Sequence, residues 1–415
     1  MSQSTLKTES LTPAAVSNVS DWDILQRATQ QLNKILIAER LCARISLANE
    51  STFVGEPTVF NSSPVEFAFT SRRTFVRLFR RMRLIDFAMG YFNGDFVVRG
   101  PISKAIDILD AMNGSTDQKE TITEFCWRLL VRSLKVLVPQ YAKKFESLDH
   151  YSQSADAYES FLGDHMQYTC GRFEQGHEDI TIDEAQVAKF RFIESLATKY
   201  IGSLAGKDHL DIGCGWGGMD AFFQKEFGTR TLGNTNCKEQ MEYAKRRYGV
   251  EIFLGDYSKL RHAGRRFDLI TIVGMIEHLT PYRRSKLLNI VGGVLRPGGV
   301  VYLQCICKPQ TWIGGDAYRV VKRQIFPGHF LETPEQTEVR LKKSGFTILE
   351  SFDHHRDYGI TTSRWVDNVQ ANEEELIRIL KDPRRYRMYL GYLAYASKLF
   401  YEGHGCLMRY VFTKS

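Results

Sequence analysis

An apolar strand that runs directly into a glycine-rich turn is the feature that most constrains this 415-residue chain. Leu210-Asp211-Ile212 is followed by Gly213-Cys214-Gly215-Trp216-Gly217-Gly218, and then by Met219–Glu226, whose composition is helical. Glycines let the backbone pass close to a ligand, and amides at a helix start can face a negative group. The turn therefore predicts a nucleotide site at the end of a strand.

Three further positions indicate which nucleotide the turn would bind. Asp211 lies on the strand itself, where its carboxylate can receive the amino group of a methionine moiety. The next strand ends in Gly233-Asn234-Thr235, without the acidic residue that usually binds a ribose in the dinucleotide folds that share the pattern GxGxxG. Asp256-Tyr257 follows the third strand, where an adenine amino group could be held. The pattern favours S-adenosylmethionine over a dinucleotide and predicts a methyltransferase.

From residue 181 onward, helical stretches alternate with short apolar runs. The runs are 209–212, 231–234, 251–254, 269–273 and 300–306. This alternation predicts an α/β fold with a doubly wound, mostly parallel sheet and helices on both faces. We expect 295–299 to form a turn into the last run, 373–401 to form a helical excursion, and 407–412 to form a closing strand.

Three parts are expected along the chain. They are a flexible tail rich in Ser and Thr at 1–20, a small α+β domain with possible lipid contact at 21–145, and the cofactor domain at 146–415. Helices are expected at 22–45 and 117–136. No run approaches 18 apolar residues, so we expect no transmembrane helix, and the tail lacks the apolar core of a secretory signal.

Cysteine usage and charge narrow the setting of the protein. The eight cysteines form no CxxC pair, so no metal site is expected. Buried reduced thiols suit a cytoplasmic protein. The net charge of +7 favours an acidic surface without indicating nucleic acid. We therefore expect a cytoplasmic protein, peripheral at an anionic membrane.

Residues 71–83 carry a dense group of basic side chains. The arginines are Arg72, Arg73, Arg77, Arg80, Arg81 and Arg83. Phe75, Leu78, Phe79 and Met82 recur at helical spacing, so the segment is expected to be an amphipathic helix. Two interpretations stay open: a surface helix with a solvated basic face, or an interfacial helix that faces anionic headgroups.

Several motifs, in their order along the chain, resemble the cyclopropane-fatty-acyl-phospholipid synthases, a methyltransferase family that acts on unsaturated lipid acyl chains. The motifs are Tyr158–Cys170, 181–186, the glycine turn with its Trp-Gly-Gly ending, 233–240, Gly274-Met275-Ile276-Glu277-His278, Ile325-Phe326-Pro327-Gly328, Asp357-Tyr358, Trp365 and, in the first region, 90–95. The resemblance covers nearly the whole chain. It implies the class I methyltransferase fold with a small N-terminal domain.

The resemblance also implies the site. The cofactor contacts would be Tyr168, Thr169, Asp211, Gly213, Gly215, Trp216, Gly217, Thr235, Gln240, Asp256 and Tyr257. In the reaction, a cis alkene attacks a sulfonium methyl held close to it. The carbocation that results loses a proton before the ring closes, and in the family a bound bicarbonate is the base. By motif match, the cradle of this anion would be Cys170, Glu277, Gln304, Ile306 and Tyr358, with Glu277 and Tyr358 bonding the anion or its proton.

Each cradle residue also has an ordinary structural interpretation. Cys170 could be a small buried apolar residue, Glu277 could favour a helix dipole, and Tyr358 could be a packed aromatic with a satisfied hydroxyl. Their joint occurrence at family positions favours a functional role for Glu277 and Tyr358.

One position departs from the family pattern. Gln304, in Gln304-Cys305-Ile306-Cys307, stands where the family has a histidine that binds the bicarbonate. A glutamine can donate a hydrogen bond but can never be cationic. Weakened anion binding is therefore expected, and Gln304→His is expected to preserve or raise activity. Plant N-methyltransferases for alkaloid amines share much of this core and also vary here.

Three functions follow from these observations. The first is transfer of a methyl or methylene group to the double bond of an unsaturated acyl chain, in phospholipid, which gives a cyclopropane or a methyl-branched product. The second is N- or C-methylation of a soluble small molecule. The third is lipid binding, with little activity, on a methyltransferase fold. An oligomer is compatible with any of them.

Overall fold

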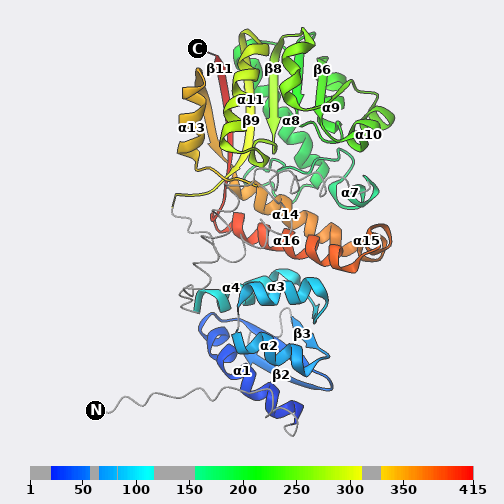
Figure 1. Ribbon diagram of the computed structural model, residues 1–415, viewed down its shortest axis with the longest axis vertical. Coiled ribbons are helices and arrows are strands. Elements are labelled where there is room, and N and C mark those ends of the chain that lie inside the picture. The colour runs from blue at the N-terminus through cyan, green and yellow to red at the C-terminus, as the bar shows by residue number, and fades with distance from the viewer. Residues whose placement is uncertain (1–19, 57–64, 82, 116–154, 311–328, 415) are drawn as a thin grey trace, which may run out of the picture. The chain divides into compact units, whose positions relative to one another are not determined.

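A seven-stranded sheet forms the core of the larger unit in the computed structural model, which describes residues 20–56, 65–81, 83–115, 155–310 and 329–414 (Figure 1). The strand order is β10-β11-β9-β8-β5-β6-β7. The strands are β5 Asp208–Ile212, β6 Arg230–Thr235, β7 Ile252–Leu254, β8 Phe267–Val273, β9 Leu295–Cys307, β10 Phe346–Asp353 and β11 Cys406–Lys414. Strands β5 to β9 are parallel, and β11 runs antiparallel to both β9 and β10. The predicted mostly parallel α/β sheet is confirmed.

Two details of the sheet differ from the prediction. Residues 295–299, expected to be a turn, are the start of β9, because Leu295 already pairs with Phe267. The register then shifts before Val300 pairs with Leu269, and Gly298 takes a φ of 76° in this bulge, a conformation that glycine adopts without strain. Strand β10 was not predicted, because its side chains are irregularly half-buried and give no clear apolar alternation.

Helices cover both faces of the sheet, so the central strands β5 and β8 are almost entirely buried. On one face, α11 (Pro281–Val294) and α13 (Pro334–Lys343) pack their leucines, isoleucines and valines against the strands. On the other face, α8 (Ile182–Ile201) and α9 (Gly218–Phe227) contribute Phe190 and Phe223. Helix α10 (Lys238–Tyr248) packs against β7. The two apolar layers position the carboxyl ends of the parallel strands, where a ligand can bind.

The predicted helical excursion is confirmed as α15 (Glu373–Leu380) and α16 (Pro383–Tyr401), which follow α14 (His355–Ala371) (Figure 1). Short helices complete the larger unit: α7 (Ala155–Leu162) and the 3₁₀ helices η5 (Tyr257–Ala263) and η6 (Ile276–His278).

The described residues up to 115, together with 387–394, cluster as a second unit. Its four-stranded sheet has the order β2-β1-β3-β4. The elements are α1 Asp21–Ala38, β1 Cys42–Leu47, β2 Glu50–Gly55, β3 Glu66–Phe69, α2 Arg72–Arg81, α3 Leu84–Asn93, β4 Val97–Arg99 and α4 Ile102–Ser115. The helix expected over 22–45 is therefore too long. Ala43, Ile45 and Leu47 alternate toward the core, and this two-residue period makes 42–47 a strand.

Several expectations fall outside the described residues. They are nearly all of the tail at 1–20, the helix at 117–136, the domain boundary at 145, and the motif at 325–328.

The predicted basic helix is confirmed as α2, and its apolar side is occupied. Phe75 and Leu78 are fully buried, and the Phe75 ring stacks on Phe79 at 4.4 Å within the unit's own core. Arg73 and Arg80 are exposed. Met82 and the side chain of Arg81 are not among the described parts of the structure. The apolar face is thus not available for insertion, so contact with headgroups would be electrostatic.

Among the described residues, no helix is long and apolar enough to cross a membrane. In the same residues no group of His, Cys, Asp and Glu side chains is arranged to hold a metal ion. The seven cysteines in this part of the chain are all free thiols.

A buried histidine on β5 makes the stability of the sheet depend on pH. The His209 ring stacks on Phe223 at 4.7 Å, with its nitrogens 3.2 and 2.9 Å from the hydroxyls of Thr231 and Thr271. Burial lowers the pKa of His209 to about 3 from 6.5. The unfolded chain therefore binds a proton that the folded chain refuses, and stability is lost as the pH falls below 6.5, by about 2 kcal/mol between pH 7 and pH 5.

Urea unfolding of the wild type and His209→Gln at both pH values measures this contribution. The variant is expected to be less stable at pH 7 but to lose about 2 kcal/mol less than the wild type on acidification. Equal losses in the two proteins would assign the pH dependence to other groups.

Candidate active site

The glycine turn between β5 and α9 has open space above it. Gly213, Gly215 and Gly217 all have positive φ angles, of 86°, 56° and 80°. A Cβ atom built on Gly215 meets no heavy atom within 4 Å, so the backbone is exposed to whatever occupies that space. The Gly213 and Cys214 amides donate to Asn234 O at 2.9 and 3.0 Å, which ties the turn to β6. The turn therefore fits a ligand that approaches the backbone closely.

The last glycine of the motif has a different role. A Cβ atom on Gly218 would lie 1.9 Å from His165 O. Gly218 is therefore required for packing, because the loop at 163–173 crosses the start of α9.

Helix α8 fixes this loop against the ends of the strands. The helix starts at a capping box in which Thr181 Oγ1 accepts from Glu184 N at 3.2 Å and Glu184 Oε2 accepts from Thr181 N at 2.8 Å. One helical face then presents Gln186 and Lys189. Gln186 Nε2 donates to Thr169 O at 2.9 Å, and Lys189 Nζ donates to Thr169 Oγ1 at 2.9 Å. Both the backbone carbonyl and the side-chain hydroxyl of the predicted cofactor residue Thr169 are thus held by α8.

Aromatic rings surround the same loop. The Tyr168 ring lies 5.1 Å from Trp365 and 5.5 Å from Tyr158, and Tyr158 lies 4.5 Å from Trp216. The structure therefore brings together two predicted cofactor residues, Tyr168 and Trp216, with an aromatic side chain from α14.

Asp211 is a buried acid that accepts a single side-chain hydrogen bond, which does not offset the cost of burying its charge. Its Oδ1 accepts from Thr271 Oγ1 at 2.8 Å, and burial raises its pKa to about 7. Burial also lowers the pKa of Lys189 to about 7. Asp220, on the first turn of α9, has both carboxylate oxygens buried without a partner in the described residues, and its pKa is raised strongly by burial and by Asp211. A cationic ligand beside Asp211 would stabilise its ionised form and release a proton.

The remaining predicted cofactor residues are engaged within the protein. Thr235 Oγ1 donates to Gln240 Oε1 at 2.7 Å. Asp256 caps η5 by accepting from Ser258 N at 2.9 Å, and it pairs with Arg283 at 2.8 Å. Tyr257 OH donates to Arg283 O at 3.2 Å. The role of Asp256 in holding an adenine amino group stays a prediction.

Glu277 is the buried acid at the end of β8. Only 2% of it is exposed. Its Oε1 accepts from Ile306 N at 2.6 Å, while its Oε2 is buried and has no hydrogen-bond partner among the described residues. Burial raises its pKa. The structure thus joins two predicted cradle residues and leaves one carboxylate oxygen available for a proton or a ligand.

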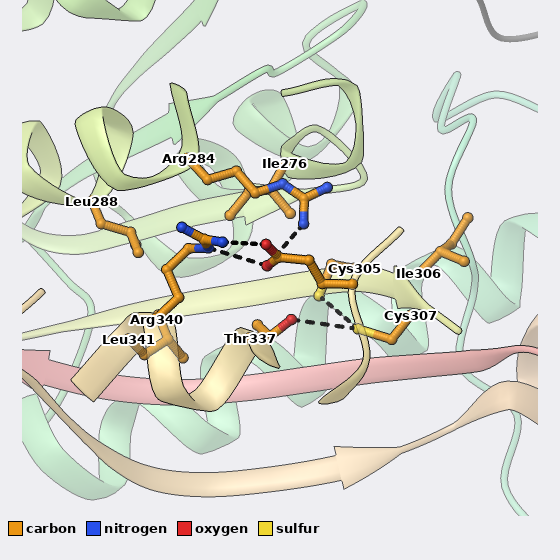
Figure 2. A pocket seen from close by; sticks show the side chains of 10 residues that line it. Ile276, Arg284, Leu288, Cys305, Ile306, Cys307, Thr337, Arg340 and Leu341 are labelled. Carbon is orange, nitrogen blue, oxygen red and sulfur yellow. Dashed lines mark hydrogen bonds and ion pairs between the residues drawn. The ribbon is translucent and has the colours of Figure 1, made fainter. Parts of the chain in front are cut away.

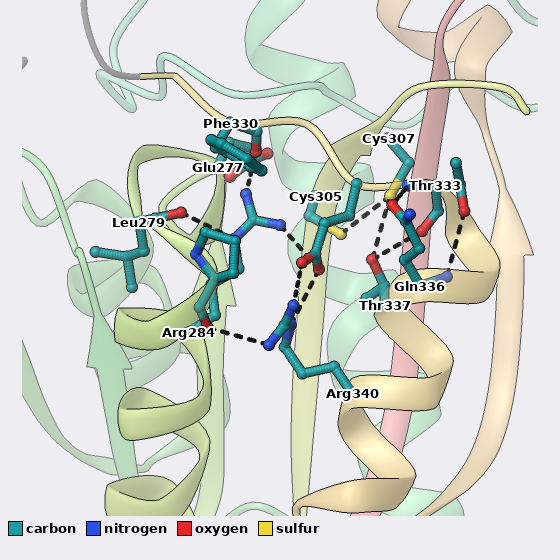
Figure 3. Close-up of polar contacts among 12 residues, drawn as sticks. Glu277, Leu279, Arg284, Cys305, Cys307, Phe330, Thr333, Gln336, Thr337 and Arg340 are labelled. Atoms are coloured by element: carbon teal, nitrogen blue, oxygen red, sulfur yellow. Dashed lines mark hydrogen bonds and ion pairs between the residues drawn. The ribbon is translucent and has the colours of Figure 1, made fainter. Parts of the chain in front are cut away.

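Ion pairs behind β9 hold the segment that carries Glu277. Arg284 and Arg340 both pair with the buried Glu332, and Arg284 Nε donates to Leu279 O at 3.0 Å (Figure 3). Burial acts to raise the pKa of Glu332, but the two guanidinium groups outweigh it, and the pKa is lowered. Phe330 N donates to Glu277 O at 2.8 Å, which anchors this wall to the site.

Figure 2 shows that the same ion pairs border a small cavity between α11, α13 and β9. Its other lining is apolar, from Ile276, Leu288, Ile306 and Leu341, with the thiols of Cys305 and Cys307. These thiols lie 3.8 Å apart on one face of β9, as their spacing predicts. Ile306, a predicted cradle residue, is part of this lining, so the cavity borders the wall of the site.

Gln304 and Cys170 meet through a residue that the sequence analysis did not identify. Arg409 on β11 is fully buried, and its Nε donates to Gln304 Oε1 at 3.0 Å. Its Nη2 donates to Gly171 O at 2.6 Å and lies 3.6 Å from Cys170 Sγ. The available signal was a single arginine inside the otherwise apolar run 407–412. Arg409 therefore places a permanent cation against Gln304, so the weakened anion binding expected from the glutamine alone stays a prediction that must take Arg409 into account.

Asp357, the neighbour of Tyr358 on the first turn of α14, joins this group. Asp357 Oδ2 lies 3.4 Å from Arg409 Nη1 and 3.2 Å from Arg172 Nη1. The Tyr358 ring packs on Phe400 at 4.6 Å. Burial raises the pKa of the Cys170 thiol to about 12, so Cys170 is neutral. A buried acid, an amide and two arginines therefore lie at the carboxyl edge of the sheet.

Comparison with known proteins places the chain among lipid-modifying enzymes. The family model described as mycolic acid cyclopropane synthetase matches residues 140–409. Cyclopropane mycolic acid synthase MmaA2 of Mycobacterium tuberculosis is 28% identical over 284 residues, which cover 65% of this chain and 96% of that protein. Its solved structure superposes with a TM-score of 0.59 at 25% identity, over 66% of this chain and 98% of that one.

Two further relatives differ in product and lipid. Cyclopropane-fatty-acyl-phospholipid synthase of Escherichia coli is 29% identical over 59% of this chain and 61% of its own length. Sphingolipid C9-methyltransferase of Komagataella phaffii is 28% identical over 69% of this chain and 61% of its own length.

Proposed function

Because this chain belongs to the mycolic acid cyclopropane synthetase family, we propose that it transfers a methyl or methylene group from S-adenosylmethionine to the double bond of an unsaturated acyl chain. It is a class I methyltransferase that uses S-adenosylmethionine. The observation that carries the substrate proposal is Glu277, a buried acid with one unpartnered oxygen, on the same edge of the sheet as the glycine turn.

The residues of the glycine turn fit the cofactor. The open space over Gly215, the amide-rich start of α9 and the buried acid Asp211 suit the methionine part of S-adenosylmethionine. Thr235 and Gln240 would hold the ribose region, and Asp256 the adenine. When bound, the cofactor supplies an electrophilic methyl group. The task of this chain's residues is to hold it in line with the alkene, because proximity and orientation supply much of the rate.

The cradle fits a small oxyanion such as bicarbonate. Glu277 Oε2 is buried without a partner in the described residues. Near Gln304, Arg409 and Arg172 both pair with one carboxylate, that of Asp357. A bound bicarbonate would supply a base. Burial raises the pKa of Glu277, and whenever the acid is protonated its O–H can donate to an anion rather than repel it. The methyl-derived proton must leave the substrate cation here, and the buried apolar walls keep water from quenching that cation.

The relatives named above include cyclopropane synthases and a C-methyltransferase. Which of these products forms depends on which proton the substrate carbocation loses. A proton lost from the new methyl group gives a cyclopropane, and a proton lost from a neighbouring carbon gives a branched or exomethylene product. We propose ring formation, because Glu277 and Arg409 bind β9 two residues apart, at Ile306 N and Gln304 Oε1, where a base held between these positions could take a proton from the transferred methyl group.

The test is incubation of purified protein with isotopically labelled S-adenosylmethionine and vesicles of monounsaturated anionic phospholipid. Mass spectrometry of extracted lipids is expected to show acyl chains heavier by one CH₂, and NMR separates ring from branch. A soluble amine pool in the same reaction serves as competitor. Labelled amine with unlabelled lipid would replace this proposal by small-molecule N-methylation, and binding of vesicles without transfer would favour a lipid-binding protein.

The small domain at 21–145 is proposed to contact the membrane that holds the lipid. Three arginines of the basic segment are neutralised by ion pairs, namely Arg72 with Asp21, Arg77 with Asp95 and Arg83 with Asp86. Among the described side chains of α2, the exposed Arg73 and Arg80 therefore carry most of the expected attraction.

Replacing Arg73 and Arg80 together by alanine is expected to weaken binding to anionic vesicles about 30-fold at low salt, because each basic residue near the surface contributes about 1 kcal/mol, and the loss is expected to disappear at high salt. Vesicle flotation at low and high ionic strength measures it. The matched control is Arg27→Ala with Lys34→Ala, which removes the same charge from exposed positions of α1. Equal losses from both pairs would show that net charge, not α2, drives association.

A further inference from the structure

A fully buried arginine in the middle of an apolar strand requires an explanation. Burying a guanidinium group is costly unless every donor finds a partner. Arg409 finds them on three other parts of the chain. Besides Gln304 Oε1 and Gly171 O, its Nη1 lies 3.2 Å from His354 Nδ1 and 3.4 Å from Asp357 Oδ2. Strand β9, the 163–173 loop and the start of α14 thus all contact the Arg409 guanidinium group.

The hydrogen bond from Arg409 determines how Gln304 is oriented. The two residues are register partners in the antiparallel pair β9–β11. A guanidinium group has donors only, so the carboxamide must turn its oxygen toward it. Tyr302 OH donates to the same oxygen at 3.4 Å. Both N–H donors of Gln304 are therefore left for another partner, and none of the described residues accepts from them.

The charges around Gln304 do not balance. Arg409 and Arg172 are cations, and Asp357 is the acid that pairs with them. The other titratable groups facing Arg409 are neutral, since burial raises the pKa of Cys170 to about 12 and of Tyr302 still further and lowers that of His354 to about 3. Lys189, beyond Cys170, adds positive charge whenever it is protonated. The cluster carries at least one excess positive charge, which favours an anion beside it.

We propose that Arg409 is a positioning residue that makes Gln304 a hydrogen-bond donor toward a small oxyanion and supplies the permanent positive charge of that site. The inference rests on the proposed function for the identity of the anion, bicarbonate. It assigns to Arg409 and Gln304 together what the family's histidine would supply alone, with a charge that does not titrate.

The pairing reverses the expectation for Gln304→His. Arg409 Nε lies 3.0 Å from the Gln304 side chain, so an imidazole introduced at position 304 would be close to a permanently charged guanidinium group. Repulsion between the two cations would disfavour the protonated imidazole. It is expected to stay neutral and to lower activity. Combined with Arg409→Met, the same imidazole loses that repulsion and can become cationic, so the double variant is expected to recover part of what Arg409→Met loses.

The experiment compares wild type, Arg409→Met, Arg409→Lys, Gln304→His and the double variant as full-length protein. Bicarbonate binding without turnover is followed by ¹³C NMR line broadening of labelled bicarbonate. The bicarbonate dependence of lipid methylation is measured alongside, and calorimetry gives the affinity for S-adenosylmethionine. Near-UV circular dichroism identifies folded variants, and Arg230→Met, at an exposed ion pair with Asp208, is the matched control for loss of an arginine.

Arg409→Met is expected to raise the bicarbonate concentration for half-saturation about tenfold or more, in binding and in activity, while cofactor affinity stays within about threefold. Arg409→Lys keeps the charge but loses the planar set of guanidinium donors, so its half-saturating bicarbonate concentration should fall between those of the wild type and Arg409→Met. A folded Arg409→Met or Arg409→Lys variant with wild-type bicarbonate dependence overturns the proposal, as does a wild type that binds no bicarbonate. If bicarbonate binds through Arg409 but no alkene is modified, the proposed function fails and the anion site stands.

Discussion

Glu277→Gln is expected to lower the rate of lipid methylation by about 10²–10⁴-fold, the range for loss of a positioned proton-transfer group. The substitution preserves shape, because the glutamine oxygen can still accept from Ile306 N as Glu277 Oε1 does at 2.6 Å. What disappears is the ability of the second oxygen to carry or exchange a proton. Initial rates at saturating cofactor and lipid, with bicarbonate present, measure the effect.

Gln304→Ala is the comparison, because it removes one neutral amide from the same cradle. Its loss is expected to be far smaller, about tenfold, since the affected hydrogen bond is worth about 0.5–1.5 kcal/mol. Glu242→Gln, at an exposed position of α10, controls for charge and should leave the rate unchanged. A rate for Glu277→Gln within tenfold of wild type would exclude Glu277 from proton transfer.

Gly215→Val is expected to abolish measurable cofactor binding, with an affinity loss of at least about 100-fold, or about 2.7 kcal/mol. The φ of 56° at Gly215 is strained for a β-branched residue, and its side chain would enter the open space over the turn. Calorimetric titration with S-adenosylhomocysteine, which does not react, gives the affinity directly.

Gly249→Val separates backbone strain from steric exclusion. Gly249 ends α10 with a φ of 69° and, like Gly215, has no heavy atom within 4 Å of a built Cβ. Both variants therefore bear a similar conformational cost, of about 1–2 kcal/mol, but only Gly215 faces the predicted cofactor. If the two folded variants bind the cofactor equally well, the ligand lies elsewhere.

The sequence was sufficient wherever structure depends on neighbouring residues. The glycine turn, the parallel strands and helix α2 follow from apolar periodicity and turn residues within short windows. The same logic failed at 22–45, where a helical composition continued into residues whose burial alternates with a period of two. It failed again at β10, because a half-exposed edge strand has little apolar alternation to detect.

Some contacts among the predicted site residues could be anticipated from the sequence, but the charges around them could not. Glu277 and Ile306 were expected to act together, and they lie within hydrogen-bond distance. Arg409 was missed because its partners are remote in sequence: Gly171 is 238 residues away and Gln304 is 105. Position 304 taken alone lacks the charge of a histidine, whereas the folded chain places a cation from another strand beside it. All of the cofactor contacts, including those at Asp256 and Tyr257, remain predictions.

The place of β11 in the sheet has a consequence for how the enzyme matures. This strand inserts between β9 and β10, yet β9 ends about a hundred residues before β11 begins. At about 5–20 residues per second, a ribosome exposes the outer edge of β9 for roughly 5–20 s before its neighbour emerges. That unpaired edge is a template for aggregation during synthesis. Arg409 arrives with the same strand, so the nascent chain can complete its sheet and charge its catalytic cradle only in one final, simultaneous step.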